Sequence, residues 1–453
     1  MRQLSRRLDG LDVVFDDRNA VANGGLVLPM TLCGRLGLKE LVDEHVHLGG
    51  APGHANVGQK AMALVASALV GGDSINDADV LRSGRAAELL GTWVPAPSTL
   101  GTFLRSFSFG DARSLDKVAG ELLKRAWAAG AGPGEGPFTI DVDSSICETY
   151  GLKKEGARFG YTSVRGLHPL LASAARTGDV LGVRQRGGSA HTARGAASFL
   201  AEVFNRARAA GATGELTLRA DSGFYSHKVT GACRKAGVHF SITAKLYGPL
   251  RKAIEVVAED QWVPIAYWAE GGADVAELSY KPKGSAEELR LIVRRVKPTP
   301  GSQLALFVKY EYHPFITDRK GPMLELEADH RRHAEVELVI RDLKEGPWAH
   351  MPSGRFGANA AWLALGAIAH NLARWSARLG KITEGSGPIA LATLRRRYIS
   401  APGHLSRSGR RTTLHLVKSW PWAKEFLVAG RPPLRGPSAR LSSQRHQPRG
   451  GGF

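Results

Sequence analysis

The segment Phe138–Ser145 most constrains what this chain can fold into. It reads Phe-Thr-Ile-Asp-Val-Asp-Ser-Ser, an apolar and β-branched run that predicts a short buried strand with carboxylates where the strand ends. A charge at the mouth of a buried strand is costly unless it is paired or binds a metal ion. An Asp that caps the following turn is the plainer explanation for this segment by itself. Asp141 and Asp143 therefore both stay open as functional residues at this point.

A second strand with an acidic end is expected at Leu216–Asp221. Between the two strands, a hairpin is predicted around Thr177–Asp179, followed by a helix over 192–209. After the second strand, a short helix near 226–236 leads into another strand over 238–244. This order indicates a mixed α/β sheet that carries acids at two strand ends.

A helix is predicted over His330–Lys344. At about 100° per residue, its branched apolar residues form one face, and Glu337 lies at the border of that face. Glu335 points roughly 160° away and is expected to face solvent. The geometry therefore selects Glu337 as the carboxylate that can be partly desolvated and bind a metal ion. Salt bridging on the helix surface is the plainer explanation if this helix is considered alone.

The charge balance indicates a polyanionic partner. Lys and Arg exceed Asp and Glu by 61 − 42 = 19 in this chain of 453 residues. The simplest such partner is nucleic acid, because bound phosphates release counterions. Three carboxylates at the edge of a mixed sheet can hold two Mg²⁺ or Mn²⁺ ions roughly 3.5–4 Å apart, since these ions prefer oxygen ligands. One ion would generate the attacking hydroxide or 3′-oxygen, and the other would stabilise the leaving oxygen.

The chain is too long for one ordinary core, so several regions are expected. A Gly- and Pro-rich linker at 130–136 marks the clearest boundary, and the residues from 401 onward hold ten Lys or Arg against one acid. The composition beyond Arg431 predicts disorder. The expected regions are a helical region for DNA-end binding or dimerisation at 1–130, a first catalytic part at 131–248, a β-rich insertion at 249–321, a second catalytic part with the Glu helix at 322–400, and a basic segment and tail at 401–453.

Membrane insertion and secretion are both disfavoured. The sequence has no run of about 18 apolar residues, and its N-terminus lacks the apolar core of a signal peptide. Cys33, Cys147 and Cys233 lie far apart, without the spacing of a metal site. We therefore expect reduced thiols and a cytoplasmic protein.

Three motifs carry a resemblance to a known family. Arg219–Phe224 reads Arg-Ala-Asp-Ser-Gly-Phe, Asp141–Ser145 reads Asp-Val-Asp-Ser-Ser, and Glu337 precedes Lys344 by seven residues. With these motifs the chain resembles the D-D-E transposases of bacterial insertion sequences. Within them it is most similar to the "thirteen-eighty" group of transposases with a Tyr-Arg-Glu-Lys signature. The resemblance implies cut-and-paste chemistry on a ribonuclease H-like mixed α/β sheet with helices, interrupted by the β-rich insertion and preceded by the helical N-terminal region.

The resemblance also implies roles for individual residues. Asp143, Asp221 and Glu337 would be the catalytic residues and the metal ligands. Asp143 fits the family's first position better than Asp141, the alternative first carboxylate, because small hydroxyl residues follow it. The residues expected to contact DNA are Lys344, His330, His333 and Arg341. The signature's Tyr and Arg are replaced here by the two histidines, whose contact with phosphate would be weaker and pH-dependent.

The expected partners are double-stranded DNA, as transposon ends and as target, and a second copy of the chain, because such enzymes act as dimers on paired ends. One alternative is a nuclease of the same fold that cuts without strand transfer, or an inactive transposase-derived copy. Another is a non-catalytic DNA-binding protein in which the acids only cap and pair. A nucleotide enzyme is disfavoured, since the sequence has no Walker loop and no convincing strand–Gly-x-Gly-x-x-Gly–helix unit.

Overall fold

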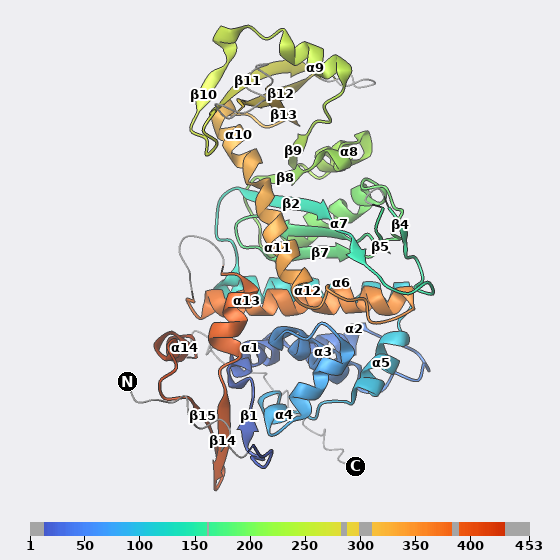
Figure 1. The fold of residues 1–453 in the computed structure, drawn as a ribbon. Helices are drawn as coiled ribbons and strands as arrows, with labels where there is room; N and C mark the ends of the chain where they lie inside the picture. The colour runs from blue at the N-terminus through green and yellow to red at the C-terminus, as the bar shows by residue number, and fades with distance from the viewer. Residues whose placement is uncertain (1–12, 161–162, 282–287, 299–309, 383–388, 431–453) are drawn as a thin grey trace, which may run out of the picture.

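Both acidic strands belong to one half of a large central sheet (Figure 1). The computed structural model describes residues 13–160, 163–281, 288–298, 310–382 and 389–430. The strands of this half are β2 (Phe138–Ser144), β6 (Leu170–Ala174), β7 (Val180–Arg184), β8 (Leu216–Ala220) and β9 (His239–Thr243). β2 lies parallel to β8, and β8 lies parallel to β9. β6 and β7 form the predicted antiparallel hairpin, and β6 pairs antiparallel with β2. The carboxyl ends of β2 and β8 therefore meet at the same edge of the sheet.

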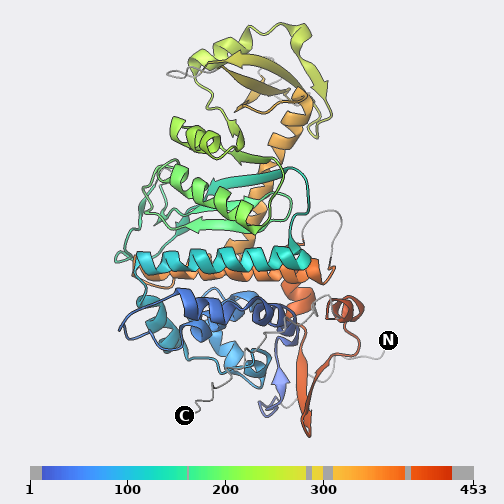
Figure 2. The ribbon, with the colours of Figure 1, turned by 180° about the vertical axis from the view of Figure 1, so that it is seen from behind.

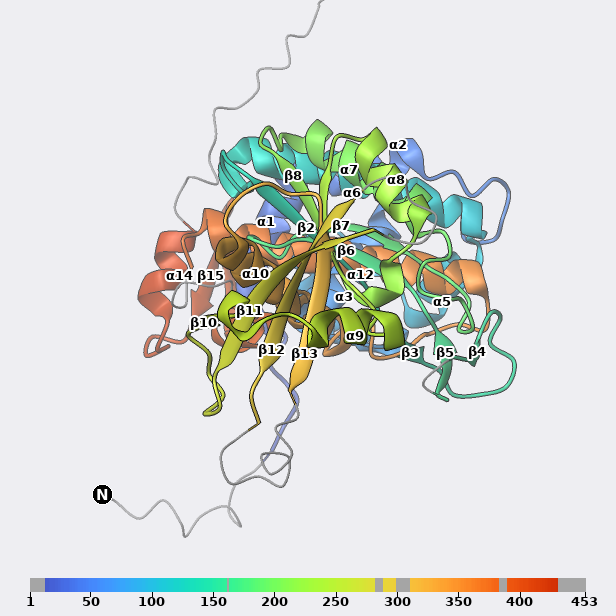
Figure 3. The same cartoon turned by 90° about the horizontal axis from the view of Figure 1, so that it is seen from above.

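The β-rich segment extends the same sheet instead of forming a separate one. Its strands are β10 (Val263–Ile265), β11 (Ala273–Tyr280), β12 (Leu289–Val296) and β13 (Glu311–Thr317). β13 pairs with β9, with Phe315 opposite Thr243. The order among the described strands is β10-β11-β12-β13-β9-β8-β2-β6-β7. Helix α9 (Gly248–Glu255) accompanies this end of the sheet, which faces the viewer in Figure 3.

A second, smaller sheet lies next to the end of β2. It consists of β3 (Cys147–Glu148), β4 (Arg158–Phe159) and β5 (Arg165–Leu167), in the order β3-β5-β4. In Figure 3 it lies on the opposite side of the molecule from the C-terminal elements β15 (Arg411–Leu416) and α14 (Ala423–Ala429).

Different helices cover the two faces of the central sheet (Figures 1 and 2). α7 (Ala196–Ala210) and α8 (His227–Lys235) lie on one face, and α10 (Met323–Arg331) and α11 (Glu335–Lys344) cross the other. The prediction of one continuous helix over His330–Lys344 is wrong, because a 3₁₀ turn at 332–334 separates α10 from α11. At this bend the Arg219 side chain donates hydrogen bonds to the main-chain carbonyls of Asp329 and Arg332. The bend is therefore fixed by a contact from a distant strand, which the helical pattern could not reveal.

Two long helices, α6 (Phe109–Ala126) and α12 (Phe356–Leu379), lie side by side along the β7 edge, between the sheet and the remaining N-terminal helices (Figure 2). The N-terminal helices on the far side of this pair are α1 (Val27–Leu36), α2 (Leu38–His45), α3 (Val57–Val70), α4 (Ala86–Leu89) and α5 (Pro97–Arg105). Ala- and Leu-rich faces allow these helices to pack closely, and α3 and α12 are buried along most of their length.

The N-terminal and C-terminal regions share a sheet. β1 (Ala20–Val21) pairs with β14 (Gly403–Ser408), which pairs with β15. Helix α13 (Leu391–Leu394) precedes these strands. Residues 431–453, for which disorder was predicted, lie outside the described residues. Within the described part of the chain, no helix combines the length and apolar character needed to span a bilayer.

Candidate active site

Asp143 and Asp221 lie side by side at the edge of the sheet. In the parallel pairing of β2 with β8, Val142 is opposite Ala220. The next residue on each chain is the carboxylate, and residues at matched positions of neighbouring strands point to the same face. The sequence predicted two acidic strand ends, and the register brings them together.

Main-chain amides at the ends of the two strands hold one oxygen of each carboxylate. An oxygen of Asp143 accepts a hydrogen bond from the Ser144 amide at 2.6 Å. An oxygen of Asp221 accepts from the Gly223 amide at 3.0 Å, which caps the short 3₁₀ helix Ser222–Phe224. Gly223 also packs against Thr192, so closely that an added Cβ would lie 2.9 Å from the Thr192 side chain. The glycine of the Arg-Ala-Asp-Ser-Gly-Phe motif is therefore required by this close approach.

Glu337 on α11 completes a group of three interacting acids. The pKa of Asp143 is raised to about 6, chiefly by burial and also by the negative charges of Asp221 and Glu337, against the Ser144 amide and His333, which lower it. The Glu337 side chain is exposed and forms no ion pair with a described residue. Asp143 thus lies within electrostatic reach of both other carboxylates, and none of the three forms an ion pair with a Lys or Arg among the described residues.

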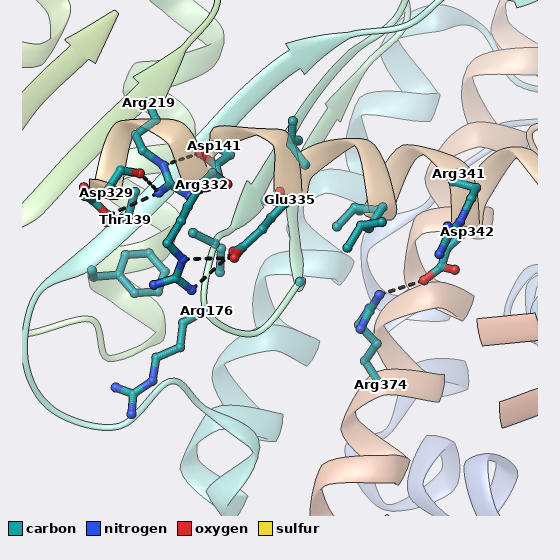
Figure 4. Close-up of a pocket in the computed structure, with 18 of the residues that line it drawn as sticks. Thr139, Asp141, Arg176, Arg219, Asp329, Arg332, Glu335, Arg341, Asp342 and Arg374 are labelled. Atoms are coloured by element: carbon teal, nitrogen blue, oxygen red, sulfur yellow. Dashed lines mark hydrogen bonds and ion pairs between the residues drawn. The ribbon is translucent and has the colours of Figure 1, made fainter. Parts of the chain in front are cut away.

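Asp141 lies in a different environment, although it is only two residues from Asp143. Its two oxygens accept hydrogen bonds from Nε and Nη2 of Arg219, at 2.7 and 2.8 Å. His333 Nδ1 lies 3.0 Å from the first of these oxygens. Both Asp141 and Arg219 are buried, and Figure 4 shows the pair beside Asp329 and Arg332 at the α10–α11 bend. The negative charge of Asp141 is therefore balanced inside the protein by the Arg219 guanidinium.

Glu335 and Glu337 differ from the sequence expectation in their exposure. Glu335 was expected to face solvent, but it is half-buried and accepts a hydrogen bond from Arg332 Nε at 2.9 Å. It lines a cavity of about 630 Å³ that lies beside α11 (Figure 4). Glu337 was expected at a partly desolvated edge, and it is the more exposed of the two. Both residues lie within α11 with its regular buried face, so their exposure differs because of their surroundings: Glu335 is partly covered by its partner Arg332 at the cavity, a contact that helical rotation alone does not reveal.

The two histidines expected at the DNA interface are engaged inside the protein. The ring nitrogens of His330 lie 2.8 Å from Ser241 Oγ and 3.1 Å from Thr243 Oγ1, and its ring stacks on Phe315 at 4.1 Å. Burial holds the pKa of His330 well below its ordinary value, so the imidazole is neutral. His333 turns toward Asp141. In this arrangement both nitrogens of His330 are used, which argues against a phosphate contact by that residue.

Lys344 and Arg341 face different parts of the surface: Lys344 borders a groove, and Arg341 lines a cavity. Lys344 is exposed and borders a groove of about 580 Å³ together with Ser144 and Ser145, which directly follow Asp143. Arg341 lines the 630 Å³ cavity instead, and its Nε lies 3.9 Å from a carboxylate oxygen of Glu345. Of the four residues expected to contact DNA, Lys344 is the one that borders a groove at the end of β2.

Two buried arginines near the acids were not expected from the sequence to have a role. Arg219 begins the Arg-Ala-Asp-Ser-Gly-Phe motif. Because it precedes Asp221 by two residues, it is expected on the same face of the strand as that carboxylate. Arg374 on α12 donates to Asp342 on α11 at 2.7 Å. The first could have been found by pairing the alternate residues of the two acidic strands. The second depends on helix packing that leaves no local signal.

Comparison with known proteins agrees with these observations. Residues 6–431 match the family described as Transposase DDE domain group 1. A match of this length defines the class of the protein, an enzyme that cleaves and transfers DNA strands. The chain belongs to the transposase DDE domain group 1 family.

The solved structures and the curated sequences were compared as well. Among solved structures, a piggyBac transposase synaptic complex with hairpin DNA is similar with a TM-score of 0.43 and 11% identity, over 84% of this chain and 80% of that one. No curated protein sequence matches the chain.

DDE transposases generally use divalent metal ions. Among the described residues, no three His, Cys, Asp or Glu side chains lie close enough together to hold an ion as they stand. The donor chemistry nevertheless fits a hard divalent cation, because Asp143, Asp221 and Glu337 offer only oxygen ligands and repel one another. Each Asp also keeps one oxygen that receives no hydrogen bond from a described residue.

Proposed function

We propose that this chain is an insertion-sequence transposase of the "thirteen-eighty" group, which binds the terminal inverted repeats of its element and moves it by cut-and-paste transposition. Asp143, Asp221 and Glu337 are its catalytic carboxylates in this proposal. The observation that carries it is the electrostatic contact of Asp143 with both other acids. Neighbouring carboxylates without basic partners repel one another, which is unfavourable, and a function that needs them explains why they occur together.

The choice of Asp143 over Asp141 is supported by their hydrogen bonds. Asp141 already receives two hydrogen bonds from Arg219 and lies against His333, so binding a cation there would require breaking a buried ion pair. Among the described residues, Asp143 accepts a hydrogen bond only from the amide of the next residue, Ser144. We therefore assign the first catalytic position to Asp143.

The strand order supports a ribonuclease H-like catalytic core. Strands β7-β6-β2-β8-β9 form a five-stranded unit in which only β6 is antiparallel to both of its neighbours. In chain order these strands are the third, second, first, fourth and fifth. The three acids lie on the first strand, just after the fourth, and on a helix that follows the β-rich extension.

Two Mg²⁺ or Mn²⁺ ions bound by these carboxylates would supply an activated water or 3′-oxygen and would stabilise the leaving oxygen. The chain's own contribution is to hold the carboxylates at one sheet edge, with one oxygen of each Asp fixed by a main-chain amide. Lys344 borders the groove next to Asp143 and is the residue that we expect to contact the DNA backbone there. The overall charge of +19 favours double-stranded DNA as ligand. We propose that two copies hold the paired ends, and that the N-terminal helices help to read the terminal repeats.

The test is a cleavage and joining assay on duplex DNA that carries the element's own ends, in Mg²⁺, Mn²⁺ or EDTA. Asp143→Asn, Asp221→Asn and Glu337→Gln should each abolish metal-dependent cutting while DNA binding is retained. Glu335→Gln is the matched control, because this neighbouring carboxylate is paired with Arg332 and should be dispensable for cutting. Cutting without joining to target DNA would assign the protein to the nucleases. Binding without cutting by the wild type in either metal would overturn the proposal.

A further inference from the structure

A second set of residues lies beside the proposed catalytic acids, in the same three segments of the chain. Asp141 precedes Asp143 by two residues on β2, and Arg219 precedes Asp221 by two residues at the end of β8. Because side chains two apart on a strand share a face, each member of this set neighbours one catalytic carboxylate. In the register of the sheet, Asp141 is directly opposite Arg219.

The third member comes from the 3₁₀ turn directly before α11, the helix that carries Glu337. His333 precedes Glu337 by four residues and approaches Asp141 with Nδ1, 3.0 Å from a carboxylate oxygen. We call Asp141, Arg219 and His333 the clamp. It contains one residue from each segment that supplies a proposed catalytic acid.

Every nitrogen of the Arg219 guanidinium is used. Nε and Nη2 donate to Asp141 on the neighbouring strand, and Nη1 donates to the main-chain carbonyl of Asp329 and lies 3.2 Å from its carboxylate. Nη2 also lies 3.4 Å from the carbonyl of Arg332. The side chain is 1% exposed, so these bonds are protected from competition by water. One rigid, planar group thereby joins β8 to β2 and both strands to the bend before α11.

We propose that the clamp is a positioning device, which sets the spacing of Asp143, Asp221 and Glu337 and thereby the affinity of the site for divalent metal. This inference rests on the proposed function of the three acids. The clamp residues are positioning residues, because they act through the carboxylates and do not touch the reacting atoms.

The physical need for such a device follows from the charges. The three acids repel one another, and Glu337 is held by no ion pair with a described residue. Its position depends on how α11 is placed over the strands. A metal site requires its ligands within about 0.5 Å of their working positions. Outer residues that orient metal ligands typically contribute about 10–100-fold to metal affinity or activity.

The chain contains a matched pair for comparison. Asp274 and Arg295 are also opposite one another in the central sheet, on β11 and β12, and Arg295 Nε donates to Asp274 at 2.9 Å. Both are buried, like Asp141 and Arg219. This second pair lies several strands away from the acids. A variant that breaks this second pair therefore shows how the loss of a buried Asp–Arg pair affects stability when the proposed metal site is not involved.

The experiment uses the full-length protein and two readouts. Binding of Mn²⁺ is measured by electron paramagnetic resonance of the free ion, on protein bound to end DNA, with Asp143→Asn as the blank. The single-turnover cleavage rate is then measured against Mn²⁺ concentration. The variants are Asp141→Asn, Arg219→Lys, His333→Ala and His333→Asn, with Asp274→Asn as the control.

We expect Asp141→Asn, Arg219→Lys and His333→Ala to weaken Mn²⁺ binding by about 10-fold or more, and to need correspondingly more metal for half-maximal cleavage. His333→Asn should recover part of the loss, because its amide can occupy the position of Nδ1. Asp274→Asn should lower the melting temperature and leave Mn²⁺ binding unchanged. Should Asp141→Asn fail to fold, the two His333 variants carry the test.

The proposal is overturned if folded clamp variants bind Mn²⁺ as the wild type does, or if Asp274→Asn weakens binding equally. These results differ from failure of the proposed function. In that case the wild type would show no Mn²⁺ binding above the Asp143→Asn blank, and no cleavage.

Discussion

Arg374 on α12 donates a hydrogen bond to Asp342 on α11 across 2.7 Å, and both side chains are buried. Asp342 follows Glu337 by five residues, so this ion pair ties the C-terminal half of the Glu helix to the longest helix of the described chain. Burial raises the pKa of Asp342 and lowers the pKa of Arg374, which means that each charge is costly by itself and depends on the other.

Asp342→Asn should therefore destabilise the protein strongly. It leaves the Arg374 charge buried without its partner, which typically costs about 3–5 kcal/mol. Urea unfolding and the melting temperature measure the loss. The control is Glu345→Gln directly after the same helix, because its 3.9 Å contact with Arg341 is exposed and should contribute less than about 1 kcal/mol. Equal losses of stability in the two variants would show that the buried Asp342–Arg374 pair does not stabilise the packing of α11 on α12.

The buried His370 should make the folded protein less stable in mild acid. It is buried on α12 with Nε2 2.9 Å from the Gly178 carbonyl oxygen, and burial lowers the pKa of His370 to about 3. In the unfolded chain its pKa is about 6.5, so the unfolded state takes up a proton first. The neutral His370 therefore contributes to the free energy of unfolding. This contribution is fully present above about pH 6.5 and is lost as the pH falls toward 3, by about 1.4 kcal/mol per pH unit.

Between pH 7.5 and pH 5 the wild type should thus lose about 2 kcal/mol through this residue. His370→Gln, which keeps a polar atom near Nε2 but cannot be protonated, should remove that part of the pH dependence. Urea midpoints at the two pH values provide the measurement. The exposed His350 serves as the comparison, and His350→Gln should leave the difference almost unchanged. A His370→Gln variant with the wild-type pH dependence would contradict the prediction.

Gly223→Ala should impair the turn that holds Asp221. The new Cβ would lie 2.9 Å from Thr192, so either the turn or the facing loop must move, at a cost of about 1–3 kcal/mol. Cleavage should fall more than DNA binding, because Asp221 would shift while the surface stays intact. Thr192→Gly removes the atoms that clash, and in the double variant it should restore cleavage. A double variant no better than Gly223→Ala would mean that the glycine is needed for another reason.

The strands and turns of the site follow from local sequence. Phe138–Ser144 and Leu216–Ala220 are apolar, β-branched runs of strand length, and the Thr177–Asp179 turn specifies the hairpin. The buried face of α11 also agrees with its helical period, since Val336, Val339 and Leu343 are all buried.

The remaining features depend on contacts between distant residues. The bend before α11 is fixed by Arg219, which is more than a hundred residues away from the carbonyls that it binds. His333 approaches Asp141 from 192 residues away in the sequence. Helical periodicity placed His333 and Glu337 on one line, but it could not show that one would turn toward a buried ion pair and the other toward solvent. The pairing of β1 with β14 is likewise invisible to any local pattern.

Lys344 tests the proposed path of DNA across the site. It is exposed, forms no ion pair with a described residue and borders the groove next to Asp143. If it contacts a phosphate, Lys344→Gln should weaken binding of end DNA and reduce the slope of log affinity against log salt by about 0.9, the release of one counterion. Arg341→Gln is the matched comparison, because Arg341 lines the cavity that also contains Asp141 and Glu335, away from this groove. Binding measured at several salt concentrations should show the smaller change for Arg341→Gln. A slope that is unchanged in Lys344→Gln and reduced in Arg341→Gln would place the DNA on the cavity side of α11, and would remove the groove from the proposed interface.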